Sequence, residues 1–114
     1  MNKQDRMFVF HIRDELRFLD EITEDLTYEE LISDKIKQHC IQKSLEIIGE
    51  ASKNISDGLK LKCKNIPWRE IAGMRDKLSH GYFDINWEIV WNVLKNELVA
   101  LKNCIEKIAA EKYY

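Results

Sequence analysis

Residues 67–85 read PWREIAGMRDKLSHGYFDI, and the rest of the 114-residue chain is organised around this stretch. Its opening proline, the only one in the chain, suits the first position of a helix, where a missing N–H has no intrahelical partner to lose. Ile71, Met74 and Leu78 then recur three and four residues apart, which predicts a short helix with one apolar face. Gly81 is typical of the residue that follows a helix end.

A compact polar cluster lies in the second half of the stretch and contains Arg75, Asp76, His80 and Tyr82. Asp76 and His80 are four residues apart, so they can meet on one face of a helix. His80 and Tyr82 fall where the predicted helix gives way to a loop, a place where side chains can reach a ligand. Taken alone, the cluster has a common structural explanation. The histidine would cap the helix, and the arginine and aspartate would be exposed charges contributing about 0–1 kcal/mol.

Apolar residues before this stretch repeat with a helical period. Those in the first 26 residues predict a long amphipathic helix: Phe8, Ile12, Leu16, Leu19, Ile22 and Leu26. Thr27 and Glu30 predict a capping box at the start of a short helical turn. A second long helix is predicted from about Asp34 to Ile55, with a wide core face: Ile36, Cys40, Ile41, Leu45, Ile48 and Ala51.

A third long helix is predicted after the stretch, capped by Asn86 or Asp84. Its apolar stripe follows a heptad: Trp87, Trp91, Leu94, Leu98, Leu101, Ile105 and Ile108. A sustained heptad can form a coiled coil, but the width of this stripe favours packing within a bundle. We therefore predict an all-α, up-and-down bundle of three long helices with the short motif helix packed across it, forming a single domain over residues 1–114.

The distribution of charge is more informative than the net charge of −2, which by itself does not indicate a nucleic-acid binder. Residues 53–77 contain seven basic and three acidic side chains, a net +4. Such a local basic surface suits a polyanionic ligand, although a solvated lysine-rich loop has the same composition.

The three cysteines, Cys40, Cys63 and Cys104, are odd in number and widely spaced, so the sequence predicts neither a disulfide framework nor a metal site. Cys40 and Cys104 fall on apolar helical faces and are expected in the core. No apolar run approaches the ~20 residues of a membrane helix, and no signal-peptide pattern or phosphate-binding loop is present. We expect a cytoplasmic protein without a cofactor, a bound metal or a membrane partner.

Arg75, His80 and Tyr82 match the RxxxxHxY signature of HEPN-domain ribonucleases. Two further segments fit one branch of that family. Residues 45–51, LEIIGEA, resemble its LxIIGEA helix, and residues 66–71, IPWREI, resemble its IPWxxI entry to the motif helix. The short signature alone is weak, but three segments in this order and spacing are specific. The chain therefore resembles a HepT-type toxin over nearly its whole length.

The resemblance implies a metal-independent endoribonuclease, the toxin of a type VII (HEPN/MNT) toxin–antitoxin pair, acting on RNA such as tRNA or mRNA. Arg75 and His80 would be catalytic and Asp76 would support them, standing where many relatives carry asparagine. Ribonucleases of this type pair their motifs across a homodimer, which supplies a second histidine. Their antitoxin, a minimal nucleotidyltransferase, adds AMP to the motif tyrosine, here Tyr82.

Two other interpretations stay open from the residues. A non-catalytic helical module that binds a nucleotidyltransferase or its nucleotide would not need both Arg75 and His80. A structural dimerisation bundle would explain the heptad stripe but not the motif. Trp68 and Trp87 flank the motif, and we expect them in the core, with a dimer interface or base stacking as alternatives. His39 lies on a helix flank and is expected at the surface.

Overall fold

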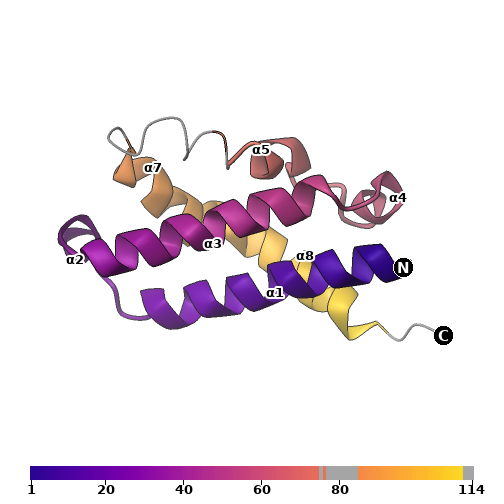
Figure 1. Cartoon of the computed structure of the whole chain (residues 1–114), viewed down its shortest axis with the longest axis horizontal. Helices are drawn as coiled ribbons and strands as arrows, with labels where there is room; N and C mark the ends of the chain where they lie inside the picture. The colour runs from indigo at the N-terminus through magenta and orange to yellow at the C-terminus, as the bar shows by residue number, and fades with distance from the viewer. Residues whose placement is uncertain (75, 77–84, 112–114) are drawn as a thin grey trace.

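The computed structural model describes residues 1–74, 76 and 85–111, and in this part of the chain every regular element is a helix (Figure 1). Two long helices, α1 (Lys3–Thr23) and α3 (Lys35–Lys53), lie beside a third long segment. That segment consists of α7 (Trp87–Asn92), a π-helical turn η2 (Val93–Glu97) and α8 (Leu98–Ala110). The prediction of an all-α bundle of three long helices is confirmed.

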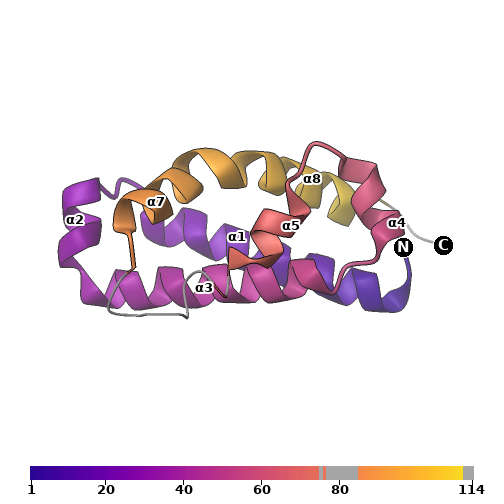
Figure 2. The same ribbon diagram turned by 90° about the horizontal axis from the view of Figure 1, so that it is seen from above.

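Short elements connect the long ones. The turn from α1 to α3 contains α2 (Tyr28–Ser33), and the path from α3 to the motif stretch contains α4 (Asp57–Lys60), the 3₁₀ turn η1 (Leu61–Cys63) and α5 (Trp68–Ala72). Figure 2, seen from above, shows α5 lying across the bundle between α3 and α8. The predicted placement of the short helix across the bundle is therefore also confirmed.

Two helix starts follow the capping signals in the sequence. Thr27 Oγ1 accepts a hydrogen bond from the Glu30 backbone N–H at 3.1 Å, and the Glu30 carboxylate accepts one from the Thr27 backbone N–H at 2.9 Å. These bonds complete the predicted capping box, and the bond from the Thr27 backbone N–H holds the pKa of the Glu30 carboxyl below its ordinary value. The Asn86 side chain caps α7 by accepting from the backbone N–H groups of Glu88 and Ile89 at 3.0 and 3.3 Å.

The hydrophobic core lies where α1, α3 and α8 face one another. Nine apolar side chains are at most 2% exposed: Val9, Ile12, Leu31, Ile41, Leu45, Ile48, Leu101, Ile105 and Ile108. The predicted position of Ile36 in this core is wrong, because its side chain is 76% exposed. Ile36 precedes Leu45 by nine residues, and at about 100° per residue this places it on the opposite side of the helix.

The first helix is shorter than its apolar repeat predicted. It ends at Thr23, because Asp25 adopts a left-handed backbone conformation with φ of 58°, and the chain turns there. Leu26 is still buried, although it lies beyond the helix end. An apolar repeat therefore located the buried residue correctly but not the end of the helix.

The apolar stripe of the third segment also differs from the heptad. The buried residues are Val90 and Val93 in the first part and Leu98, Leu101, Cys104, Ile105 and Ile108 in the second. The step from Val93 to Leu98 is five residues, which is the spacing of a π-helical hydrogen bond. The predicted stripe residues Trp87, Trp91 and Leu94 are therefore only partly buried at the edge of the core.

Two carboxylates join elements that are distant in sequence. The Arg17 guanidinium donates two hydrogen bonds of 2.9 Å to Glu106, which ties α1 to α8 and holds the pKa of the Glu106 carboxyl below its ordinary value. Asp5, only 4% exposed, accepts hydrogen bonds from the Ser56 backbone N–H at 2.9 Å and from the Ser56 hydroxyl at 2.5 Å. The start of α1 is thereby fixed to the start of α4.

Cys63 and Cys104 form a disulfide, which the spacing of the cysteines in the sequence did not reveal. Their Cα atoms are 6.2 Å apart, and 41 positions separate them in the sequence. The bond joins the connector ahead of α5 to α8 because the chain folds back over α8 after α4. Spacing patterns do not reveal such a long-range pairing. Cys104 is buried as predicted, and Cys40 is the free cysteine.

Removing this disulfide is expected to lower the free energy of unfolding by about 2–4 kcal/mol, because a cross-link over a loop of this length restricts the unfolded chain. Urea denaturation of Cys63→Ala and of the oxidised parent measures the difference. The parent in reducing agent should unfold like the variant, and Cys40→Ala should keep the parent's midpoint. Equal midpoints for oxidised and reduced parent would contradict the expectation.

Candidate functional site

One of the four predicted site residues, Asp76, lies among the described residues. Its backbone is helical and its side chain is exposed. Arg75, His80 and Tyr82 lie outside the described residues, so the structure neither places them nor brings them together. Their roles stay predictions, and the described part of the site is the frame on either side of them.

The frame before the motif begins with α5. Pro67 is the N-cap of this helix rather than its first residue, and the helix starts at Trp68. The Trp68 indole N–H donates a hydrogen bond of 3.1 Å to the backbone carbonyl of Cys63. The rest of the Trp68 ring is partly buried against the core, as predicted. The tryptophan therefore connects the start of α5 to the segment that the disulfide holds on α8.

The helix predicted from Pro67 to about His80 is interrupted at Gly73. Helix α5 ends at Ala72, the Gly73 N–H donates to the Arg69 carbonyl at 3.0 Å, and helical backbone is found again at Met74 and Asp76. Glycine propagates a helix less well than any residue except proline, which explains where the break falls. The prediction of an unbroken motif helix is therefore wrong.

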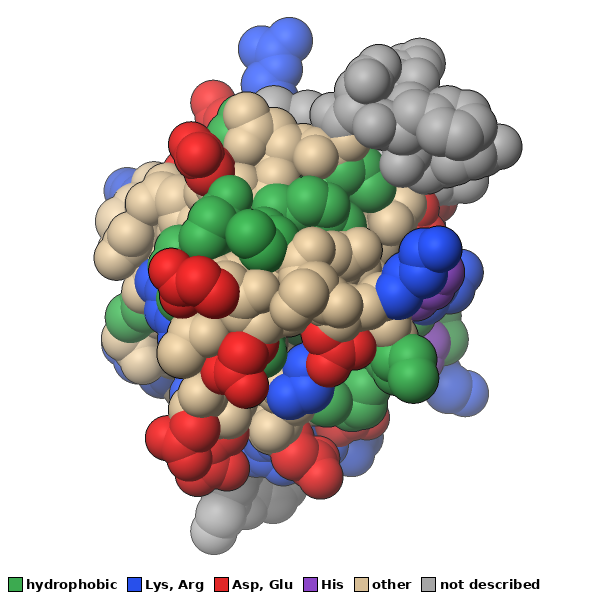
Figure 3. Space-filling view, turned by 90° about the vertical axis from the view of Figure 1, so that its left-hand side faces the viewer, with side chains coloured by type: hydrophobic (Ala, Val, Ile, Leu, Met, Phe, Trp, Pro, Cys, Tyr) green, Lys and Arg blue, Asp and Glu red, His purple; other side chains and the backbone are tan. Residues whose placement is uncertain are grey.

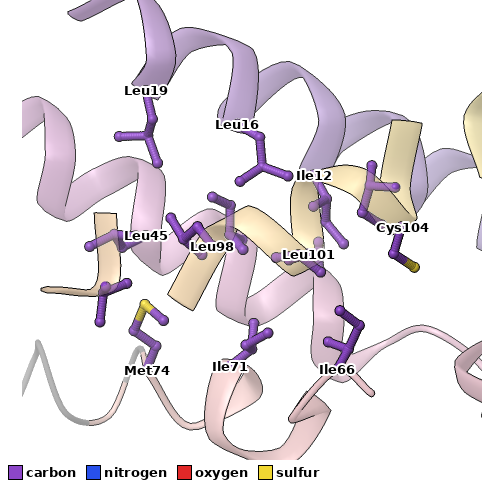
Figure 4. Packing of buried hydrophobic residues seen from close by; sticks show 14 of the residues in the cluster. Ile12, Leu16, Leu19, Leu45, Ile66, Ile71, Met74, Leu98, Leu101 and Cys104 are labelled. Carbon is purple, nitrogen blue, oxygen red and sulfur yellow. The ribbon is translucent and has the colours of Figure 1, made fainter. Parts of the chain in front are cut away.

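The core-facing side of α5 is shown in Figure 4, where Ile71 and Met74 point toward Leu45 of α3 and Leu98 of α8. Ile71 is 4% exposed and Met74 is 7% exposed. A cavity of about 130 Å³ lies between these side chains and the π-helical turn η2. Burial of these two side chains sets the position from which the chain enters the motif.

Replacing Ile71 with alanine is expected to lower the free energy of unfolding by about 2–5 kcal/mol, since it leaves a cavity under α5. Ile36→Ala is the matched control, because the Ile36 side chain is 76% exposed and its loss should change stability by less than about 0.5 kcal/mol. Urea denaturation monitored by circular dichroism measures both. Equal stabilities of the two variants would show that α5 is not anchored through Ile71.

The frame after the motif borders a larger cleft of about 430 Å³ between α3 and the start of α7. One wall consists of polar side chains of α3, including Lys35, His39 and Lys43, and the other contains Ile85 and Trp87. Figure 3 shows basic and histidine side chains together at one edge of this end of the molecule. Sequence reasoning treated His39 as an isolated surface residue and missed the cleft. The four-residue spacing of Lys35, His39 and Lys43 was the feature of the sequence that could have indicated this wall of the cleft.

Most basic side chains of the predicted basic segment that the structure describes are exposed. Lys53, Lys62, Lys64 and Arg69 are exposed and Lys60 is half-buried, and Lys62 forms an ion pair of 3.2 Å with Glu111. Within residues 1–74, 76 and 85–111, no three His, Cys, Asp or Glu side chains gather in an arrangement that could hold a metal ion. In the same part of the chain, no helix is both long and apolar enough to span a membrane.

Comparison with known proteins identifies the class of this helical bundle. A family model described as "Ribonuclease HepT-like" matches residues 12–108. The protein is an RNase with an all-α, HEPN-like fold. The chain belongs to the HepT-like ribonuclease family.

Individual relatives are similar in sequence to this chain over nearly its whole length. A protein of Caldanaerobacter subterraneus subsp. tengcongensis, provisionally named as an RNase, is 39% identical over 93% of this chain and 95% of its own length. A protein of Thermococcus cleftensis named "Probable ribonuclease HepT" is 37% identical over 95% of this chain and 98% of its own. A provisionally named RNase of Methanocaldococcus jannaschii is 40% identical over 95% and 94%. No solved structure gives a significant match.

Proposed function

We propose that this RNase is the toxin of a type VII toxin–antitoxin pair and that it cleaves RNA without a metal ion at a site shared by two copies of the chain. The observation that carries the proposal is the RxxxxHxY signature at Arg75–Tyr82 in a chain that belongs to the HepT-like ribonuclease family. RNA is accordingly the proposed substrate.

The chemistry needs few groups. The ribose 2′-hydroxyl loses a proton and attacks the adjacent phosphorus, the bond to the 5′-oxygen breaks, and that oxygen gains a proton. A histidine can give or take these protons near neutral pH, and an arginine offers a fixed pair of donors to the phosphate oxygens. We assign these tasks to His80 and Arg75, with the exposed Asp76 as a supporting group.

A homodimer would supply the second proton-transfer group, because each motif contains one histidine. An exposed apolar side chain near the frame is consistent with a second copy packing there. Ile89 of α7 is 48% exposed and lines the cavity beside Ile71 and Met74. Burying such side chains against a partner would stabilise the association.

His80→Ala is expected to slow RNA cleavage in EDTA by roughly 10²–10⁴-fold, because it removes proton transfer. Arg75→Ala is expected to slow it by about 10²–10³-fold, because it removes charge stabilisation in the transition state. Cleavage of a labelled RNA under single-turnover conditions measures both effects. Circular dichroism and sedimentation velocity on the same samples check that folding and the expected dimer are retained.

Mixing the His80→Ala and Arg75→Ala chains gives a further control. If the site is shared between two chains, a mixed dimer regains one intact Arg75 and one intact His80 in the same site. If His80→Ala cleaves at the parent rate, the catalytic assignment is wrong. A fully active monomer would instead contradict the shared site while leaving the assignment of His80 in place.

We also propose that Tyr82 is the point of control, receiving AMP from a cognate minimal nucleotidyltransferase. The tyrosine comes two residues after His80, directly behind Gly81. A phosphate attached there would suit the Arg75 guanidinium and would occupy the place of an RNA phosphate. Inhibition would then follow from local blockade of the site.

Incubation with the nucleotidyltransferase and ATP is expected to add mass in AMP units to the peptide containing Tyr82 and to abolish RNase activity. Intact-mass measurement and peptide mapping test this. Tyr82→Phe should acquire no mass, whereas Tyr28→Phe, which alters a tyrosine in α2 that packs on Trp91, should be modified like the parent. Full inhibition with unmodified Tyr82 would contradict the proposal and favour inhibition by binding alone.

The alternative of a non-catalytic module that binds a nucleotidyltransferase or its nucleotide is not favoured, because the chain belongs to the HepT-like ribonuclease family.

A further inference from the structure

The cleft between α3 and the start of α7 is a second place where the chain could hold a ligand. It has a volume of about 430 Å³, within the range of small-molecule sites. We propose that this cleft binds one strand of RNA, with phosphates held by Lys35 and Lys43 and one base stacked on Trp87. The inference rests on the proposed function in one respect, which is that RNA is the ligand.

The α3 wall presents cationic groups in a row. Lys35, His39 and Lys43 are spaced by four residues, so they lie along one face of the helix over a length of about 12 Å. All three side chains are exposed. Neither lysine forms an ion pair with another described residue, unlike Lys62 and Lys102, which pair with Glu111 and Asp20. The two ammonium groups are therefore positioned to meet two separate phosphates of one strand.

The opposite wall offers an aromatic surface. Trp87 is partly buried against the core and also lines the cleft. Its backbone is fixed at the start of α7, where the Asn86 side chain accepts hydrogen bonds from Glu88 and Ile89. Because every nucleobase has a flat face, a fixed aromatic ring opposite a cationic row is the arrangement that binds single strands with little sequence preference.

Other lining residues limit how a strand can lie. Glu46 is the one acidic side chain among the described lining residues, and it follows Lys43 by three positions. Its charge disfavours a phosphate beyond Lys43, which confines the strand to the Lys35–Lys43 part of the wall. The Gln38 amide N–H donates to the Leu31 carbonyl at 2.8 Å, so this side chain is held in place. The half-buried Gln42 adds a donor and an acceptor between the two lysines.

The covalent chain keeps this cleft close to the motif. Ile85 lines the cleft and follows His80 by five residues. An extended chain spans at most about 3.6 Å per residue, so the two positions are within ~18 Å of each other. One bound strand of a few nucleotides is long enough to reach both the cleft and the motif. The cleft would thus orient RNA for cleavage at the motif.

The test uses the full-length protein and a fluorescein-labelled 12-nucleotide RNA with 2′-O-methyl riboses, which lacks the attacking hydroxyl. Fluorescence anisotropy gives the dissociation constant between 50 and 300 mM salt. The double variant Lys35→Gln/Lys43→Gln should bind about 10-fold more weakly at low salt. Its slope of log K against log salt should be shallower by about 1.4, because two phosphate contacts to a single strand are lost.

The matched control is Lys3→Gln/Lys107→Gln, which removes the same net charge from exposed positions on α1 and α8, outside the cleft. It should keep the parent's salt slope. Trp87→Leu should weaken binding by about 5–100-fold through lost stacking, and Trp87→Phe should restore most of the affinity. Circular dichroism verifies that each variant is folded.

Because RNA binding and RNA cleavage are measured separately, the experiment tests the RNA site in the cleft independently of the catalytic role of His80. Loss of affinity in the lysine double variant with an unchanged control supports the cleft, even if His80→Ala cleaves RNA like the parent and the catalytic proposal fails. If both double variants bind equally, or if the parent does not bind the 2′-O-methyl RNA, the proposed RNA site in the cleft is wrong. Equal binding by Trp87→Leu and the parent overturns the stacking role.

Discussion

The packing of α5 against α3 and α8 is the constraint on which the rest of the site depends. A helix of five residues is far too short to be stable alone in water. It is held by the buried Ile71, by the Trp68 indole hydrogen bond to Cys63, and by the disulfide from Cys63 to Cys104. These contacts act on one side of the motif, and the Asn86 cap of α7 acts on the other. The chain is thus fixed both before and after the motif.

The fold could be predicted from the sequence wherever a short-range rule determines it. The helical apolar period located Ile12, Leu45 and Leu101, which are at most 1% exposed. The capping signals at Thr27 and Asn86 gave two helix starts. What could not be predicted depends on tertiary arrangement. The disulfide requires the connector to fold over α8, and Ile36 is exposed because its side of α3 has no partner among the described residues.

The residues of the candidate site could be predicted from a family signature, and not from a short-range folding rule. The residues Arg75, His80 and Tyr82 were found by their spacing within a family signature, and family membership supports RNase activity independently of their geometry. The cleft beside Trp87 could not be found in that way, because it depends on how α3 and α7 pack. Of its cationic row, the sequence singled out only His39, and as a surface residue on a helix flank. The opposing aromatic wall is what gives the row a role in the proposed RNA site.

The π-helical turn at Val93–Glu97 has a consequence for the evolution of the surface. An additional residue in a regular α-helix would rotate everything before it by about 100° relative to everything after it, and the π-helical turn absorbs this rotation. Val90 and Val93 therefore face the core, although a regular helix of the same sequence would place Trp91 and Leu94, seven and four residues before Leu98, on that face. A helix can thus accept a single-residue insertion at this turn while the residues on both sides keep their faces.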